Sequence, residues 1–268
     1  MLRRVASGIS RILNKAPNRL QWAIYGAFPE RCPRRYSQMI EVERLRKLIR
    51  FLEVDCVFDI GANEGQYAMM LREMVGYEGR IISFEPTPHL ASKLRILSEN
   101  DPLWTVEEVA ISNSSGFADF NLMVSSEMSS LSSPLSSETE ILSHMNRMME
   151  VIQVKTETLE SAYSRICGTG DVCRPFLKMD TQGYDMVIAR SAEHVLRRFS
   201  GIQTELSIKR LYEKSEKIGS CIDFYDSVGF DLAALIPNNQ GHFPLLLEMD
   251  GLFVRRDLAS RTPATEAK

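Results

Sequence analysis

Apolar runs and amphipathic stretches alternate along the middle of the chain. The apolar runs at 56–60, 80–84 and 104–111 are short and bounded by polar residues or glycine, which predicts β-strands. Between them, the stretches at 64–75 and 88–99 have apolar residues at helical spacing and predict helices. Strands that alternate with helices in this way indicate a parallel sheet covered by helices.

The same alternation continues towards the C-terminus. A helix over 40–52 is expected ahead of the first strand. Further strands are predicted at 117–122, 151–155, 175–180, 201–206, 230–236 and 245–254, with helices from Thr158, over 184–198 and over 217–228. No long helix fits between the last two strands, which predicts that they pair antiparallel, because a parallel link needs a crossover of roughly a dozen residues.

These elements divide the chain into one domain and its appendages. Residues 1–37 are basic and interrupted by prolines, and they predict an N-terminal appendage. Residues 38–258 form the single predicted domain, and 259–268 a disordered tail. Within the domain, 112–150 is rich in serine and has little periodicity, so we expect an insertion that acts as a mobile lid.

One turn carries the first chemical signal. Residues 57–65 read Val-Phe-Asp-Ile-Gly-Ala-Asn-Glu-Gly and join a predicted strand to a helix, which places backbone amides at the strand's carboxyl edge. Glu85 ends the next strand, about 20 residues further on, where an acid accepts hydrogen bonds from ribose hydroxyls. Because Gly61 and Gly65 lack the spacing that admits a pyrophosphate, the turn favours a nucleoside such as S-adenosylmethionine over a nicotinamide dinucleotide. A plain strand–helix turn in another α/β protein remains the alternative.

Five motifs in order give the chain a family resemblance. They are residues 59–65, 84–86, 108–112, 177–185 and 249–254. With them, the chain resembles the FkbM-type methyltransferases over about residues 50–256. The resemblance implies an α/β class I methyltransferase fold, with a Rossmann-like seven-stranded sheet, an antiparallel last strand and helices on both faces. It also implies S-adenosyl-L-methionine as cofactor, and a hydroxyl oxygen of a carbohydrate-containing or other small hydroxylated molecule as the methyl acceptor.

The resemblance assigns roles to individual residues. The cofactor-binding residues that it implies are Asp59, Gly61, Asn63, Gly65, Glu85, Pro86 and Ala110, with Ala110 beside the adenine. Lys178, Asp180 and Gly183 match the family's Lys-x-Asp-x-x-Gly element. Gln182 stands where many members carry Glu, so no catalytic carboxylate is expected at that position.

Three side chains are candidates for catalysis. Asp180 and Glu205 end neighbouring predicted strands, so both are expected at the carboxyl edge of the sheet, where an acceptor hydroxyl could lose its proton to Asp180. Lys178 lies two residues before Asp180 and therefore on the same face of the strand. A structural ion pair between Lys178 and Asp180 is the alternative, and Glu205 could instead position acceptor hydroxyls or cap a helix.

Metal chemistry finds little support in the sequence. The four histidines are scattered without ligand spacing. Asp59, Asp180 and Glu205 could together hold Mg²⁺, but Asp59 is already assigned to the cofactor, so no metal site is predicted.

Charge and cysteine content restrict the partners. The net charge is −3, but residues 1–28 hold five basic and no acidic residues, so the rest carries −8 and does not favour nucleic acid. Apolar positions of 1–28 recur at helical spacing, which leaves open a weak peripheral contact with an anionic membrane, packing on the domain, or a homodimer. Five cysteines without a close C-x-x-C pair, and no apolar stretch long enough to span a membrane, predict a cytoplasmic protein, at most peripheral to the inner membrane surface.

The sequence leaves two other functions open. A nucleic-acid methyltransferase that modifies amino groups needs an Asn/Asp-Pro-Pro-aromatic element, whereas this chain has Asp-Thr-Gln-Gly at 180–183. A non-catalytic module could keep the cofactor fold and bind partners through its basic N-terminus. The sequence favours the enzyme, without identifying its acceptor.

Overall fold

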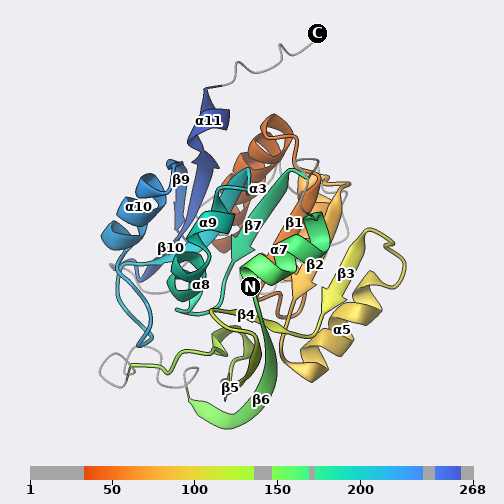
Figure 1. Ribbon diagram of the computed structural model, residues 1–268, viewed down its shortest axis with the longest axis vertical. Helices are drawn as coiled ribbons and strands as arrows, with labels where there is room; N and C mark the ends of the chain where they lie inside the picture. The colour runs from red at the N-terminus through yellow and green to blue at the C-terminus, as the bar shows by residue number, and fades with distance from the viewer. Residues whose placement is uncertain (1–32, 136–146, 169–172, 238–244, 261–268) are drawn as a thin grey trace, which may run out of the picture.

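The computed structural model describes residues 33–135, 147–168, 173–237 and 245–260. It shows a central sheet with helices on both faces and a smaller sheet beside one end of it (Figure 1). The amphipathic pattern predicted in 1–28 and most of the predicted C-terminal tail lie outside the described residues. No described helix is both long and apolar enough to cross a membrane.

The central sheet has the predicted strand content and polarity. Its strands are β1 (Cys56–Ile60), β2 (Arg80–Phe84), β3 (Trp104–Glu107), β7 (Pro175–Met179), β8 (Gly201–Ser207), β9 (Phe230–Pro237) and β10 (Glu248–Arg255). In space they follow the order β3-β2-β1-β7-β8-β10-β9. β10 runs antiparallel to both of its neighbours, and the other described pairs in this sheet are parallel. The predicted fold class is therefore confirmed, including the antiparallel pairing of the last two strands.

Two hydrophobic cores separate the helices into layers. On one face lie α3 (Pro33–Phe51), α4 (Gln66–Met70), the π-helical turn η2 (Leu71–Val75) and α5 (Pro88–Ser98). On the other lie α7 (Leu159–Cys167), α8 (Asp185–Ser191), α9 (Glu193–Leu196) and α10 (Ile218–Ser227). Figure 1 shows α7, α8 and α9 in front of the sheet and α3 behind it. The short α11 (Arg256–Ala259) follows β10.

One predicted strand, 104–111, is wrong because it is two strands in two sheets. β3 follows β2 as far as Phe84, where β2 ends, so the chain has no parallel partner beyond Glu107. It then forms β4 (Ala110–Ser112) in a separate sheet, with the order β4-β6-β5. The predicted helix over 184–198 is also divided, because Ala192 (φ −119°, ψ 26°) departs from helical geometry between α8 and α9.

The serine-rich region contains most of the small sheet. β5 (Gly116–Met123) pairs antiparallel with β6 (Met148–Thr158), and the short 3₁₀-helix η3 (Ser126–Met128) follows β5. Ser130 donates its hydroxyl to the carbonyl oxygens of Thr181 and Gln182, both 2.8 Å away. These bonds anchor the segment on the main sheet, and its predicted opening as a lid stays a prediction.

The strand order reverses between β1 and β7, and this is where the chain makes its closest backbone contact. Gly61, directly after β1, has φ +77°, and a Cβ at this position would lie 2.0 Å from the carbonyl oxygen of Asp180. Only glycine fits both the conformation and the contact. Ligands of open α/β sheets bind in the crevice at such a reversal, outside the carboxyl ends of the strands.

We expect Gly61→Ala to destabilise the protein by at least about 2 kcal/mol, because the added methyl group overlaps the backbone at a positive φ. Urea unfolding monitored by circular dichroism measures the change. Gly219→Ala is the matched control, because Gly219 lies in α10 with open space around its Cβ position and alanine there should be neutral or slightly stabilising. Equal stability of the two variants would contradict the close approach of β1 and β7.

Candidate active site

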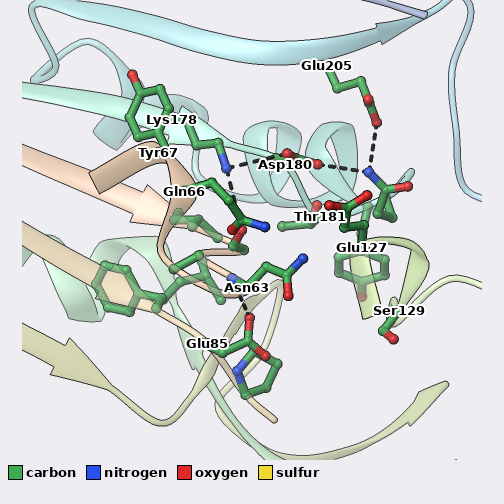
Figure 2. Close-up of a pocket in the computed structure, with 18 of the residues that line it drawn as sticks. Asn63, Gln66, Tyr67, Glu85, Glu127, Ser129, Lys178, Asp180, Thr181 and Glu205 are labelled. Carbon is green, nitrogen blue, oxygen red and sulfur yellow. Dashed lines mark hydrogen bonds and ion pairs between the residues drawn. The ribbon is translucent and has the colours of Figure 1, made fainter. Parts of the chain in front are cut away.

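A pocket of about 380 Å³ opens at the carboxyl ends of the central strands. Eight residues predicted from the sequence line it, namely Gly61, Asn63, Glu85, Pro86, Ala110, Lys178, Asp180 and Glu205. Figure 2 shows Asn63 and Glu85 on one side of the pocket and the three candidate catalytic side chains on the other. The structure therefore brings together residues that are more than a hundred positions apart in sequence.

Two predicted cofactor residues do not line the pocket. Asp59 is completely buried within the sheet. Gly65 (φ +85°) lies at the start of α4, and a Cβ there would meet the side chains of Leu94 and Trp104. Both residues act outside the pocket lining. Asp59 contacts Lys178, and Gly65 allows Leu94 of α5 and Trp104 of β3 to pack closely on the turn.

Glu85 is held in place by backbone amides. Its carboxylate accepts hydrogen bonds from the N–H groups of Asn63 and Thr87, both at 2.9 Å. Burial raises the pKa of Glu85, while these hydrogen bonds act in the opposite direction. A carboxylate has about four acceptor positions, so two amide bonds leave capacity for the vicinal hydroxyls of a ribose.

Apolar side chains continue the pocket beyond Glu85. Those that line it are Ile60, Met70, Phe84, Ala110, Ile111, Phe120 and Leu131. They come from both sheets, from α4 and from the segment after η3, so the serine-rich region contributes to the pocket. A carboxylate with free acceptor positions, next to an apolar surface, suits the ribose and the adenine of an adenosine, and these residues therefore fit the predicted cofactor.

A row of polar side chains crosses the buried face of the sheet. The strand register places Ser83, Asp59, Lys178 and Gln203 side by side on β2, β1, β7 and β8. Ser83 donates to Asp59 at 3.0 Å, and the indole of Trp104 donates to Ser83 at 3.0 Å. Such a row within an apolar layer is costly unless its members pair with one another. Asp59 Oδ2 accepts from Ser83, whereas Oδ1 has no hydrogen-bond partner among the described residues and faces the Lys178 ammonium at 3.5 Å.

Lys178 is the centre of this row. Its ammonium nitrogen lies 3.5 Å from a carboxylate oxygen of Asp59, 3.5 Å from one of Asp180 and 3.4 Å from the carbonyl oxygen of Gly61. The ring of Tyr67 lies 5.3 Å away. Burial alone would lower the pKa of Lys178, but the surrounding carboxylates, first that of Asp180, raise it above its ordinary value. Lys178 is therefore a permanent cation at neutral pH and not a proton acceptor.

Gln182 fixes the other side of Asp180. Its amide nitrogen donates to Asp180 at 2.8 Å and to Glu205 at 3.3 Å, and its amide oxygen accepts from the hydroxyl of Tyr212 at 3.1 Å. The same hydroxyl lies 2.9 Å from the carbonyl oxygen of Met128 in η3. This role was not predicted from the sequence, because it depends on an amide at a position where the resemblance implies a carboxylate.

A buried carboxylate, Asp185, holds the ends of two strands and was also missed. It accepts from the backbone N–H of Thr181 at 2.8 Å and from the Thr181 hydroxyl. It also accepts from the Thr204 hydroxyl at 2.8 Å and from the backbone N–H of Glu205 at 3.2 Å. Asp185 therefore fixes the chain on both sides of the pocket edge without lining the pocket.

Carboxyl groups gather on the far side of Lys178. This acidic cluster consists of Glu41, Asp180, Glu205, Glu248 and Asp250, from α3, the end of β7, β8 and β10. Burial first, and then mutual repulsion, raise the pKa values of Glu205 and Asp250 well above their ordinary range. Among the described residues, no group of three or more possible ligands is arranged to hold a metal ion.

The long α3 contributes to this side through a hydrogen-bonded chain. The Tyr67 hydroxyl donates to Gln203 at 2.9 Å, and the Gln203 amide donates to Glu41 at 2.9 Å. Nothing in the sequence connects these three residues, because they come from two helices and a strand. The hydrogen bond between Gln203 and Glu41 forms because α3 packs on the sheet.

We expect Glu248→Gln to stabilise the protein more at pH 8 than near pH 4.5. Burial raises the pKa of Glu248 from 4.5 to about 8. Between these values the unfolded chain ionises and the folded protein does not, so this carboxyl destabilises the fold increasingly as pH rises through the window. Thermal melts should show a gain of roughly a few degrees at pH 8 and a smaller difference at the lower pH. Glu99→Gln, at an exposed position, is the control, and a gain independent of pH would contradict the burial of Glu248.

Together, the sheet topology and the family match define a class I methyltransferase that uses S-adenosylmethionine. Residues 59–232 match the family model of the methyltransferase FkbM domain, and the chain belongs to this family. The family and the cofactor predicted from the sequence are thereby confirmed. None of the curated proteins compared with the chain matches it.

Three solved structures are similar to this chain at low sequence identity. An FkbM methyltransferase from Methylobacillus flagellatus is 12% identical, with a TM-score of 0.43 over 75% of this chain and 43% of its own. The Aeropyrum pernix fibrillarin with bound S-adenosyl-L-methionine is 12% identical, with a TM-score of 0.42 over 75% and 66%. The magnesium protoporphyrin IX methyltransferase of Synechocystis, also with bound cofactor, is 9% identical, with a TM-score of 0.43 over 82% and 81%. The chain thus spans under half of the first and about two thirds of the second.

Proposed function

We propose that this protein transfers the methyl group of S-adenosylmethionine to a hydroxyl oxygen of a carbohydrate-containing or other small hydroxylated molecule. One observation carries the proposal. The carboxylate of Asp180, held by Lys178 and Gln182, borders the same pocket as Glu85. The proposed proton acceptor and the proposed ribose-binding acid thus line one pocket.

The cofactor side is the one formed by Glu85, Asn63 and the apolar surface. Glu85 would accept the ribose hydroxyls, and Ala110 with its apolar neighbours would contact the adenine. When bound, the cofactor supplies an electrophilic methyl group on a positively charged sulfur. Four carboxyl groups, those of Glu41, Asp180, Glu205 and Asp250, line the opposite side of the pocket together with Lys178, and carboxyl groups suit a bound cation.

Asp180 is the proposed general base. Its side chain is 43% exposed, so an acceptor hydroxyl can reach it. Lys178 and Gln182 fix one carboxylate oxygen each, and the remaining lone pairs can take the proton that the hydroxyl loses. Positioning of the acceptor oxygen in line with the methyl group is the other contribution that the protein makes to the rate.

The polarity of the acceptor side supports a hydroxylated acceptor. Gln38, Glu41, Gln203 and Asp250 line it together with the catalytic candidates. Carboxylate and amide groups spaced around a pocket form hydrogen bonds with several hydroxyls at once, as a sugar would present them. Gln38 and Glu41 come from α3, which precedes the part of the chain that matches the family model.

Glu85→Ala should weaken S-adenosylhomocysteine binding at least tenfold. It removes charge-assisted hydrogen bonds of roughly 1.5–3 kcal/mol each to the ribose. Isothermal titration calorimetry measures the affinity, and circular dichroism checks that the variant is folded. Glu99→Ala, at an exposed position of the neighbouring helix end, should bind as the unaltered protein does. Unchanged affinity of a folded Glu85 variant would remove the ribose assignment.

Asp180→Asn should retain cofactor affinity within a few fold and slow methyl transfer by 10²–10⁴, the usual contribution of a general base. Transfer of a tritiated methyl group to the best acceptor found among free sugars, glycosides and polyhydroxylated compounds is the measurement. Asp223→Asn on α10 is the control, since Asp223 is exposed and distant in the fold. If cofactor affinity falls and turnover per bound cofactor does not, Asp180 has a binding role.

The same acceptor panel separates the enzyme from a non-catalytic module. A module that only binds the cofactor would show calorimetric binding and no labelled product with any acceptor. Labelled product on an amine or carboxylate, but on no hydroxyl compound, would correct the acceptor class and retain the methyltransferase.

A further inference from the structure

Three cysteines converge at the edge of the sheet opposite the pocket. Cys56 is the first residue of β1, Cys167 is the last of α7, and Cys173 lies two residues before β7. The sulfur atoms of Cys167 and Cys173 are 2.7 Å apart. Cys56 is completely buried, whereas the other two are partly exposed and can meet a small solute. The amino ends of β1 and β7 lie side by side here, because Cys56 is in register with Pro175.

Charged groups around the pair favour a thiolate. The guanidinium of Arg80, at the start of β2, lies 3.5 Å from the Cys173 sulfur. Asp55 lies on the other side, where it accepts from the Cys173 thiol at 3.5 Å and from the backbone N–H of Arg174 at 2.9 Å. Hydrogen bonding with Cys173 and Cys56, and then the charge of Arg80, lower the pKa of Cys167, whereas hydrogen bonding with Cys167 and burial raise the pKa of Cys173. Two partly exposed thiols in contact, with a guanidinium beside them, have the arrangement of a reactive dithiol.

We propose that Cys167 and Cys173 form a reversible disulfide site that reacts with oxidants of the hydroperoxide class. The Cys167 sulfur attacks one peroxide oxygen, the O–O bond breaks, and the leaving oxygen takes a proton. Cys167 is then a sulfenic acid. The Cys173 sulfur attacks the Cys167 sulfur, the S–O bond breaks, and water leaves as the S–S bond forms. The two thiols lose two electrons and the peroxide gains them, and a dithiol reductant reverses the change.

The other thiols and a metal fit these observations less well. Cys56 is completely buried, and its pKa is raised by its thiol neighbours, so it keeps its proton. Cys221, which packs in the core, is apart from this group, and burial raises its pKa to about 12. No cluster of ligands suited to a metal ion occurs in the part of the chain that the structure describes.

A disulfide would have a structural effect of its own. It would join the end of α7 to the chain that begins β7, and β7 carries Lys178. Gly168, next to Cys167, has φ +71° and lets the chain turn directly after the helix. The site lies at the opposite strand ends from the pocket, so it does not depend on the proposed transferase reaction.

Peptide mapping of the full-length protein tests the proposal. Trypsin should release residues 166–178 as one peptide with both cysteines, because Arg174 is followed by proline. After brief hydrogen peroxide treatment and iodoacetamide blocking, this peptide should be lighter than the reduced, unblocked peptide by two hydrogen atoms. Dithiothreitol before blocking should instead yield the doubly alkylated peptide. The peptides that contain Cys56 and Cys221 should stay in their alkylated form.

Single variants distinguish the cysteine that attacks the peroxide from the cysteine that then forms the disulfide. Cys173→Ser should leave a sulfenic acid on Cys167 that dimedone traps, Cys167→Ser should abolish the reaction, and the control Cys221→Ser should still form the disulfide. Oxidation of the native peptide no faster than in the urea-unfolded chain would overturn the proposal, because the folded arrangement would then provide no activation. A disulfide from Cys167 to Cys56 would overturn the assignment of Cys173.

Discussion

The ammonium group of Lys178 is the charge on which the pocket edge depends. It lies between Asp59 and Asp180, one carboxylate buried inside the sheet and the other bordering the pocket. Removing a buried cation would leave Asp59 without a counter-charge, which costs far more than an exposed ion pair is worth. Lys178 also donates to the carbonyl oxygen of Gly61, which lies between β1 and β7, where the strand order reverses. The same ammonium group therefore stabilises the buried part of the sheet and positions a carboxylate of the pocket.

Around this centre the protein uses neutral donors where more charge would be costly. Gln182 and Gln203 each contact a carboxyl group of the acidic cluster, and each also accepts from a tyrosine hydroxyl. An amide satisfies two partners of opposite type, which a carboxylate cannot do. A glutamate in place of Gln182 would add repulsion to a cluster in which Glu205 and Asp250 already have raised pKa values. This explains the amide at position 182 without reference to catalysis.

The small sheet and the serine-rich segment have a clear part in the pocket. Ser126 donates to the Asn63 side chain at 3.1 Å, and Ser130 bonds to the backbone after β7. Phe120 and Leu131 supply part of the apolar surface. Polar residues that hold backbone groups, with a few apolar anchors, allow this segment to close the pocket without belonging to the main core. The serines from which a loop was predicted therefore also hold this segment against the main sheet.

Local patterns determined much of this protein. Alternating apolar runs and helical periodicity defined the seven strands of the main sheet, and the two acids Glu85 and Asp180 at strand ends indicated the pocket edge, because strand polarity alone sends those ends to one side. Tertiary structure determined the contacts between segments that are far apart in the sequence. It separated β3 from β4 where β2 ends, placed Asp59 behind the pocket, and brought Glu41 from α3 to Gln203. Side-chain contacts between distant segments depend on packing, and packing leaves no periodic signal in the sequence.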